Sequence, residues 1–236
     1  MPPLPADSIH ARACKLKCEK ILTRPNEAEN IPNLMKKINE LGYDYLVIND
    51  CSQDESGILL NSMKLNHLDL PINIGLAGVT QMGFRYAYEN NYDAAIVIDG
   101  DGQHPPFYIK SLLDKLNEGY DYVIGSRFVE EKKPWSLRMI GSRLIGFAIK
   151  LKTGQIINDP TSGMRALGKK VLKEFAYEMN YVNESDALTH VLKNKLKVCE
   201  IQVSMEQREG GASYFDNIIK SGKFMLNVLI SIIFIQ

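Results

Sequence analysis

The chain has 236 residues, 45% of them hydrophobic, and its 28 basic and 28 acidic side chains give a net charge of zero. This length and composition can fill the core of one large α/β domain. The balanced charge provides no overall field that would attract nucleic acid. The four cysteines form neither a CxxC pair nor a pattern of metal ligands, so we interpret them as thiols of a reducing, cytoplasmic compartment.

The N-terminal end is irregular. Residues 1–20 contain three prolines before Ser8 and no apolar run, which argues against a secretory signal. We treat residues 1–20 as an irregular segment and residues 21–214 as one domain.

The middle of the chain alternates between strand and helix patterns. Apolar runs that each follow a Tyr-Asp pair predict strands at residues 45–48, 94–98 and 122–124. Helical spacing, with Gly42 and the pair Pro105-Pro106 as boundary signals, predicts helices over residues 31–41, 76–89 and 107–116. This alternation predicts a single α/β domain with a mostly parallel central sheet flanked by helices on both sides.

The C-terminal end is nearly all apolar from Phe224 to Gln236. About 20 such residues are needed to cross a bilayer, and this run is shorter. We expect residues 215–236 to form a membrane-proximal helix that lies on a membrane surface or begins a spanning segment. The alternative is a helix docked on the protein's own core.

Two carboxylates follow the predicted strand at residues 94–98. Asp99 and Asp101 are one residue apart, and Gln103 adds an amide oxygen. Ionised carboxylates are costly to bury without a counter-charge, and the carboxyl ends of such strands are where open α/β sheets bind ligands. Three hard oxygen ligands there suit a divalent cation that also holds substrate phosphates.

Other polar groups follow the neighbouring strands. Asp50 could accept hydrogen bonds from a nucleobase or ribose, or it could cap the next helix, for which Asp54 is better placed. Arg127 could clamp a phosphate with two donors. Residues 73–75 could bring backbone N–H groups near an anion, although a simple turn is an equal alternative.

The second half of the chain adds two loops and one helical pair. Residues 158–165 are long enough for a loop over a pocket, and residues 208–213 form a basic, glycine-containing loop. Arg138 and Ser142 are four residues apart, on one face of a helix, where they could hold a phosphate or simply be solvated.

Seven motifs occur in a characteristic order. They are Pro25-Asn26-Glu27, Asn49-Asp50-Cys51-Ser52-Gln53-Asp54, Asn73-Ile74-Gly75-Leu76-Ala77-Gly78, Asp99-Gly100-Asp101-Gly102-Gln103-His104, Gly125-Ser126-Arg127, Asp159-Pro160-Thr161-Ser162-Gly163 and Arg208-Glu209-Gly210-Gly211-Ala212-Ser213. This order resembles the family-two glycosyltransferases of the GT-A fold. Within them it is most similar to the branch of dolichyl-phosphate mannose synthases and bacterial polyprenyl-phosphate glycosyltransferases.

The resemblance implies roles for individual residues. Mg²⁺ or Mn²⁺ would be held by Asp99, Asp101 and Gln103. The acceptor phosphate and the departing diphosphate would be bound by Arg127, Arg138, Ser142 and Arg208. A UDP- or GDP-sugar would be bound by Pro25, Asn26, Glu27, Asn49, Asp50, Gly75, Asp99, Gly100 and Asp101.

The sequence departs from the family pattern in two places. Asn49 stands where the family usually has an aspartate, which weakens the expected recognition of base and ribose. The residues just before Pro25 lack the apolar run of a first buried strand.

The expected reaction is inverting transfer of a sugar to a polyprenyl phosphate, with Asp99, Asp101, Arg127 and Arg208 as the catalytic residues. A phosphate acceptor is already anionic and needs no strong base, whereas a saccharide acceptor would need one. Asp159, Glu184 and Asp186 are the candidate bases for that alternative. A nucleotidyltransferase and a binding module that has lost catalysis are further alternatives.

The resemblance places the protein on the cytoplasmic face of the membrane. A homo-oligomer or a small membrane-protein partner is compatible with this expectation.

Overall fold

The computed structural model describes residues 30–100, 102–178, 181, 183–206 and 218–235. The residues 1–20, the motif Pro25–Glu27, the carboxylate Asp101 and the loop 208–213 lie outside these ranges.

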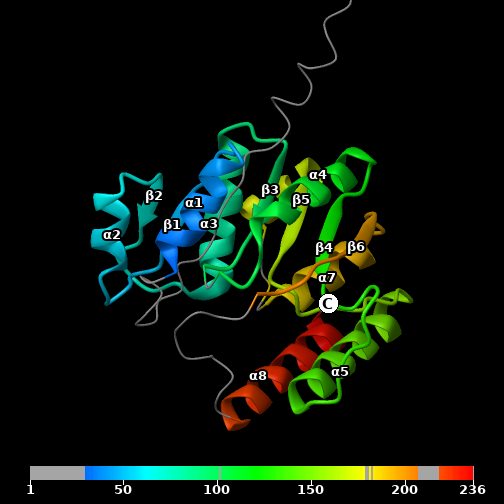
Figure 1. The fold of residues 1–236 in the computed structure, drawn as a ribbon. Coiled ribbons are helices and arrows are strands. Elements are labelled where there is room, and N and C mark those ends of the chain that lie inside the picture. Colours follow the sequence, from blue (N-terminus) through cyan, green and yellow to red (C-terminus); the bar gives the residue numbers. More distant parts are fainter. Residues whose placement is uncertain (1–29, 101, 179–180, 182, 207–217, 236) are drawn as a thin grey trace, which may run out of the picture.

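Four strands form the larger sheet, in the order β3-β5-β4-β6 (Figure 1). They are β3 (Ala94–Val97), β5 (Arg165–Gly168), β4 (Tyr122–Ser126) and β6 (Val198–Gln202). β5 is antiparallel to both of its neighbours, while β4 and β6 are parallel, so β3, β4 and β6 all run in one direction. A second, smaller sheet pairs β1 (Val47–Asn49) with β2 (His67–Asp69) in parallel.

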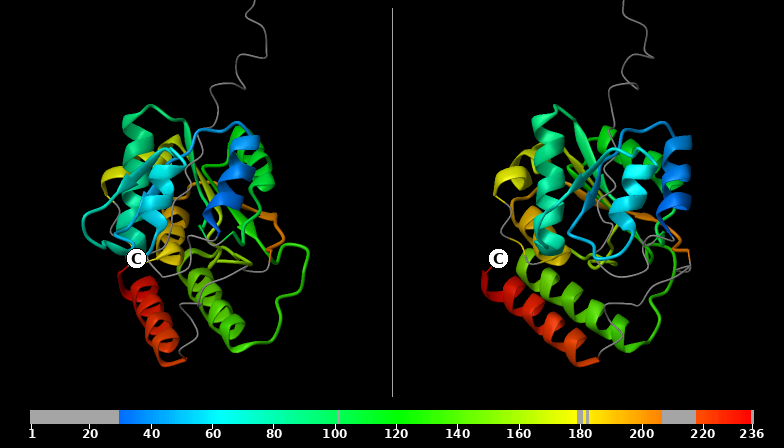
Figure 2. Two further views of the ribbon diagram at one scale, coloured as in Figure 1. Left: turned by 60° about the vertical axis from the view of Figure 1, so that its left-hand side comes forward. Right: turned by 90° about the vertical axis from the view of Figure 1, so that its left-hand side faces the viewer.

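Helices cover both faces of the larger sheet (Figure 2). On one face, α1 (Ile31–Glu40) and α4 (Ile109–Asn117) pack against side chains such as Ile96 and Val123. The core on the opposite face contains side chains of α3 (Gly75–Glu89), α6 (Lys169–Tyr177) and α7 (Glu184–Lys193). α5 (Leu137–Thr153) joins this core and packs against α7. A short helix, α2 (Ser56–Ser62), connects β1 and β2.

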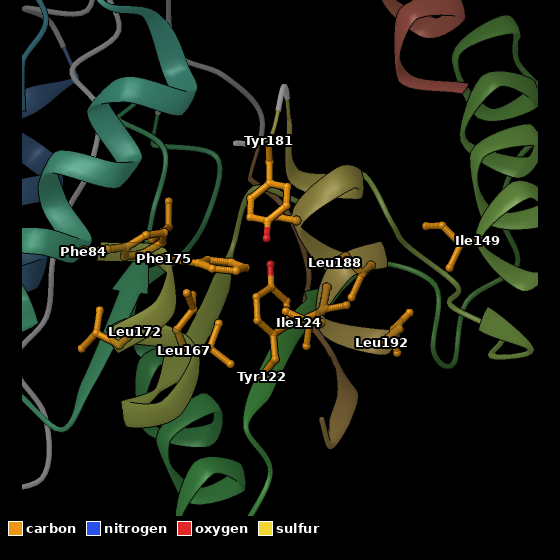
Figure 3. Packing of buried hydrophobic residues seen from close by; sticks show 14 of the residues in the cluster. Phe84, Tyr122, Ile124, Ile149, Leu167, Leu172, Phe175, Tyr181, Leu188 and Leu192 are labelled. Atoms are coloured by element: carbon orange, nitrogen blue, oxygen red, sulfur yellow. The ribbon is translucent and has the colours of Figure 1, made fainter. Parts of the chain in front are cut away.

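The hydrophobic core on the side of α3, α6 and α7 is rich in aromatic rings, several of which are shown in Figure 3. Phe175 lies 5.2 Å from Tyr181 and 6.1 Å from Phe84 between ring centroids. The hydroxyl groups of Tyr122 and Tyr181 point toward each other in this view.

The predicted α/β arrangement is confirmed. The expected helices over residues 31–41, 76–89 and 107–116 correspond to α1, α3 and α4, the last preceded by a 3₁₀ turn at Pro106–Tyr108. Gly42 has φ +69°, a left-handed conformation that suits glycine at the end of α1. The sequence pattern predicted no strand at the positions of β2, β5 and β6, of which β2 has only three residues.

The C-terminal segment is a helix that packs on the domain. α8 (Ile218–Ile230) continues into a π-helical turn at Ser231–Ile235, and the pair lies alongside α5 (Figures 1 and 2). Val228 and Ile232 are fully buried on the protein side. The hydroxyl of Ser231 donates to Oδ2 of the buried Asp186 in α7 at 2.6 Å. The docked-helix alternative therefore holds for one face of this segment.

None of the helices that the structure describes has the length and hydropathy needed to cross a membrane.

We predict that Ser231→Ala weakens the docking of the C-terminal helix. The substitution removes a buried hydrogen bond to a charged group, so the free energy of unfolding should fall by about 2 kcal/mol, measured by urea denaturation. Ser111→Ala on the exposed face of α4 is the control and should be neutral. Equal stability of both variants would contradict the assigned role of this bond.

Candidate active site

Asp99 lies just beyond the end of β3, at the edge of the sheet, as the sequence indicates. Its carboxylate approaches the loop 159–163 so closely that a Cβ atom on Gly163 would overlap its Oδ2 atom. The same Oδ2 is 3.9 Å from Nδ1 of the buried His104. Glycine at position 163 is therefore required for the approach of two distant segments.

The donor atoms here suit a hard divalent cation. The side chain of Asp99 is 25% exposed. Gln103 lies in the loop that follows, and its backbone carbonyl accepts a hydrogen bond from the amide of Glu206 at 2.9 Å. Carboxylate and amide oxygens are the ligands that Mg²⁺ and Mn²⁺ prefer. The described residues contain no cluster of three or more His, Cys, Asp or Glu side chains suited to a metal, while Asp101 is outside them.

Asp50 fixes the N-terminus of α3. Its Oδ1 accepts from the amide of Ile74 at 2.7 Å, and its Oδ2 accepts from the amide of Gly75 at 3.0 Å. From the sequence, the backbone N–H groups of residues 73–75 could lie near an anion. In the structure, the N–H groups of Ile74 and Gly75 donate to the Asp50 carboxylate. Asp54 instead caps α2, because its Oδ1 accepts from the amide of Ser56, as predicted. A contact of Asp50 or Gly75 with a nucleotide stays a prediction.

Asn49 is occupied by neighbouring protein groups. Its Nδ2 donates to Oδ1 of Asp69 at 2.8 Å, and its Oδ1 accepts from the amide of Ser52 at 3.1 Å. An aspartate at position 49 would place a like charge against Asp69. The pair Asn49–Asp69 therefore gives a physical reason for the departure from the family pattern.

Arg127 and Asp159 form a buried, two-pronged ion pair. Nε donates to Oδ2 at 2.6 Å and Nη2 donates to Oδ1 at 2.8 Å, while the Arg127 amide also donates to Oδ2. Burial alone would raise the pKa of Asp159, but the hydrogen bonds and charge of Arg127 outweigh it and lower this pKa below its usual value. The pair ties the loop after β4 to the loop before β5.

A lysine that the sequence analysis missed joins this pair. Nζ of Lys133 donates to Oγ of Ser142 at 2.9 Å, and Ser142 lies 3.3 Å from Oγ1 of Thr161. Lys133 and Arg127 each lie 5.1 Å from the ring centroid of Phe128. Burial lowers the pKa of Lys133, Asp159 opposes this, and the nearby Arg127 and Arg143 charges add to the lowering. An anion bound here would relieve that repulsion.

Two side chains of β6 hold the loops of this cluster in place. Glu200 accepts from the amides of Asn158 and Asp159, both at 2.8 Å. Oε1 of Gln202 accepts from the amides of Val129 and Glu130, both at 2.9 Å. The sequence contained no signal for either role, because both contacts span more than 40 residues.

The remaining site predictions have mixed outcomes. Arg138 and Ser142 both lie on α5, but Arg138 is exposed whereas Ser142 is buried. Arg208 lies outside the described residues. Of the three candidate bases, Asp159 is bound to Arg127 and Asp186 to Ser231, and both are fully buried. Glu184 lines a cavity, together with Arg165.

We predict that Gly163→Ala displaces the Asp99 carboxylate, because the added methyl group would overlap it. Affinity for UDP or GDP in the presence of Mn²⁺ should fall at least tenfold in calorimetric titrations. The control is Gly146→Ala in α5, where the nearest atom to a new Cβ is 3.4 Å away. Unchanged affinity in Gly163→Ala would exclude a role of Asp99 at its observed position.

We also predict a pH-dependent cost for Arg127→Met. At pH 7 the variant should lose about 3–5 kcal/mol of stability, because the buried Asp159 loses its partner. In the wild type, the lowered pKa of Asp159 contributes stability that is present above the unfolded pKa, near 3.9, and is lost as pH falls through the folded value. In the variant, burial raises this pKa, so its deficit should shrink as the pH falls toward 4.

Urea denaturation at pH 7 and pH 4.5 measures this difference. The double variant Arg127→Met/Asp159→Asn should recover part of the loss at pH 7. A deficit that is the same at both pH values would show that the charge of Asp159 is not responsible.

The sequence matches a known protein family. The family described as "Glycosyl transferase family 2" matches residues 23–175. The chain is 26% identical to a UDP-N-acetylglucosamine–dolichyl-phosphate N-acetylglucosaminyltransferase from Methanococcus voltae, covering 89% of this chain and 93% of that protein. It is 27% identical to polyprenol monophosphomannose synthase from Mycolicibacterium smegmatis, covering 82% and 78%.

The fold is also that of a solved glycosyltransferase. Glucosyl-3-phosphoglycerate synthase from Mycobacterium tuberculosis, solved with Mg²⁺ and UDP, matches with a TM-score of 0.71 at 16% identity, covering 98% of this chain and 84% of that one. Because the family match spans well over half of the sequence, this chain belongs to glycosyl transferase family 2 and is a glycosyltransferase with an α/β, GT-A-like fold.

Proposed function

We propose that this protein transfers a sugar, with inversion, from a UDP- or GDP-sugar to a polyprenyl phosphate at a membrane surface. One observation carries the proposal: the cation cluster of Arg127, Lys133 and Arg143 lies at the start of a helix whose outer face is apolar and exposed. A charged site that continues into an apolar surface suits an acceptor with a phosphate head and a hydrocarbon chain.

The apolar face of α5 follows helical spacing. Five side chains that recur every three or four residues are exposed along it, namely Leu137, Ile140, Leu144, Phe147 and Leu151. Exposed apolar side chains of α8 and its final turn lie on the neighbouring helix, namely Leu226, Ile230, Ile233 and Phe234. Exposed apolar side chains gathered on two neighbouring helices are typical of a site of interaction with a membrane or a protein.

The border of this surface has the composition of a membrane interface. Trp135, just before α5, is 85% exposed and stacks on the guanidinium of Arg143 at 4.3 Å. Lys150 and Lys152 lie in the last turn of α5. Tryptophan and long basic side chains favour the boundary between lipid and water. A bilayer surface is therefore the occupant that we assign to the α5–α8 face.

The names of the relatives agree with a lipid phosphate as acceptor. The protein from Methanococcus voltae is named for transfer to dolichyl phosphate, and the one from Mycolicibacterium smegmatis for the synthesis of polyprenol monophosphomannose. An undecaprenyl-phosphate mannosyltransferase from Micrococcus luteus is 27% identical over 88% of this chain.

On the donor side, Asp99, Asp101 and Gln103 would hold Mg²⁺ or Mn²⁺. When bound, the cation supplies positive charge that stabilises the diphosphate leaving group. Asp50 keeps the N-terminus of α3 in place beside this edge of the sheet. Glucosyl-3-phosphoglycerate synthase binds both a divalent cation and UDP, which supports the same use here.

On the acceptor side, Arg127, Lys133, Arg138, Ser142 and Arg208 would position the phosphate. One of its oxygens is already anionic at neutral pH and attacks the anomeric carbon directly. The bond from this carbon to the diphosphate oxygen breaks, and the nucleoside diphosphate leaves with the electron pair. Positioning by fixed cations is sufficient, because no proton has to be removed.

A saccharide acceptor is the second candidate function. It would require a general base, yet Asp159 and Asp186 are buried and already hydrogen-bonded. Glu184 is the remaining candidate among the three. The exposed apolar face of α5 has no purpose in transfer to a soluble glycan, which favours the lipid phosphate.

The proposal predicts that Leu151→Glu uncouples the enzyme from lipid. Vesicle binding, and transfer to long-chain polyprenyl phosphate in vesicles, should each fall at least tenfold, because a carboxylate replaces an apolar contact with the bilayer. Transfer to a short, water-soluble prenyl phosphate should stay within twofold of the wild type. The control is Ile58→Glu on α2, since Ile58 is 72% exposed and Leu151 is 71% exposed.

Labelled donors in a panel of UDP- and GDP-sugars, followed by lipid extraction, give the readout. Transfer only to a soluble glycan would establish the second candidate instead. Nucleotide-sugar binding without transfer to either acceptor would indicate a module that has lost catalysis. Equal effects of Leu151→Glu and Ile58→Glu would remove the membrane role of α5.

A further inference from the structure

A small cavity of about 20 Å³ lies between the sheet and the helices α3, α6 and α7. Its apolar wall includes Phe84, Leu167 and Phe175, which are shown in Figure 3. Its polar lining comes from Thr80, Tyr122, Arg165, Asn183 and Glu184. A space of this size holds one water-sized group, such as a hydroxyl.

Val97 and Arg165 link the cavity to Asp99. Val97, two residues before Asp99, lines it and pairs with Arg165 across the sheet. The buried guanidinium of Arg165 donates to the hydroxyl of Tyr122 at 3.0 Å and to the carbonyl of Ser162. Burial would lower the pKa of Arg165, but Tyr122, Glu184 and Asp99 raise it above its usual value. The charge of Arg165 is therefore held between the cavity and the Asp99 carboxylate.

One residue of the lining, Asn183, uses only part of its side chain in hydrogen bonds with the described residues. Oδ1 of Asn183 accepts from the amides of Ser185 and Asp186, at 2.8 and 3.1 Å, and so caps α7. Nδ2 of the same side chain is buried and has no hydrogen-bond partner among the described residues. Asn183 is only 5% exposed. Because buried polar groups normally have a partner, this donor points to a ligand.

We propose that the cavity receives one hydroxyl group of the donor sugar, which accepts from Nδ2 of Asn183 and donates to the carboxylate of Glu184. This assignment rests on the proposed function, because it supposes a nucleotide sugar at Asp99. The α3 residues Leu76 and Ala77 line the cavity, and the same helix begins at the amides that bind Asp50. One helix therefore connects the two parts of the donor site.

The chemistry of the cavity excludes the other parts of the substrates. A prenyl chain would bury the polar groups of Asn183 and Glu184 against hydrocarbon, and a nucleobase is far larger than the available space. The hydrogen-bond donor of Asn183 and the hydrogen-bond acceptor of Glu184 both line the cavity, and a hydroxyl group can bind both of them. Sites built in this way discriminate strongly against substrates that lack the hydroxyl, because their own polar groups are then left unpaired.

The substitution Asn183→Asp isolates Nδ2. Aspartate keeps the oxygen that caps α7 and is an equally good N-cap residue. The donor N–H₂ is replaced by a second acceptor. Because aspartate also adds a charge to a side chain that is only 5% exposed and lies next to Glu184, Asn183→Ser is made beside it. Serine keeps a capping oxygen without a charge, and its thermal midpoint should stay within about 2 °C of the wild type and its kcat/KM should fall like that of Asn183→Asp. The matched control is Asn61→Asp, which makes the same change on the exposed face of α2.

Two measurements test the role of the cavity. For the preferred donor, kcat/KM of Asn183→Asp should fall at least tenfold, while the Kd for UDP or GDP with Mn²⁺ stays within twofold, since these lack the sugar. One deoxy analogue of the donor should be at least tenfold poorer with the wild type. With Asn183→Asp, kcat/KM for that analogue should be little lower than for the full donor, because the variant already lacks the hydrogen bond from Nδ2 to the hydroxyl.

The opposing outcomes are distinct. Unchanged kcat/KM, or equal loss of affinity for the nucleoside diphosphate, would overturn the assignment of Asn183. If the wild type transfers no sugar, the proposed function fails, and the Kd of intact nucleotide sugars then tests the cavity. A selective loss in Asn183→Asp would still support the assignment. The absence of any nucleotide-sugar binding to the wild type would overturn both.

Discussion

The active-site half of this protein depends on the buried ion pair between Arg127 and Asp159. A carboxylate with no exposed surface needs a counter-charge, and Arg127 provides it with two parallel hydrogen bonds. The pair fixes the loop that follows β4 against the loop that precedes β5. The backbone of Gly163, four residues after Asp159, lies directly against the Asp99 carboxylate. Together with the hydrogen bonds of Glu200 and Gln202 to these loops, the ion pair fixes Arg127 relative to the Asp99 carboxylate.

The polar residues at the end of β1 also stabilise the fold, because their side chains bind neighbouring protein groups. Asp50 neutralises the N-terminus of α3 with both oxygens, and Asn49 binds Asp69 where a carboxylate would repel it. These contacts order the edge of the sheet before any ligand arrives. A second acceptor position remains on each oxygen of Asp50, so its structural role and nucleotide recognition are compatible.

The periodicity of the sequence was sufficient to predict α1, α3 and the position of Asp99 at the end of a strand, because each of these depends on a pattern within one segment. It failed for β5, whose four residues follow a turn-rich segment and are held by strands more than 40 residues away. Periodicity also failed for Lys133, which ends the charged run Glu130-Glu131-Lys132-Lys133, a composition typical of a solvated loop. Only the fold brings Lys133 to Ser142 and Phe128. The role of Asp50 was ambiguous for the same reason, since its partners are 24 and 25 residues along the chain.

The first turn of α7 connects the small cavity to the C-terminal helix. Asn183 and Glu184 line the small cavity, while Asp186 in the same turn accepts from Ser231 beyond α8. α8 in turn packs on α5, where Met225 occupies the space that a side chain at position 141 would need. A shift of the α5–α8 pair relative to the sheet would therefore have to break a buried hydrogen bond next to the cavity. This connection through α7 links the apolar α5–α8 face to the cavity. Under the proposed function, it would set the distance between a phosphate held at a lipid surface and the donor sugar.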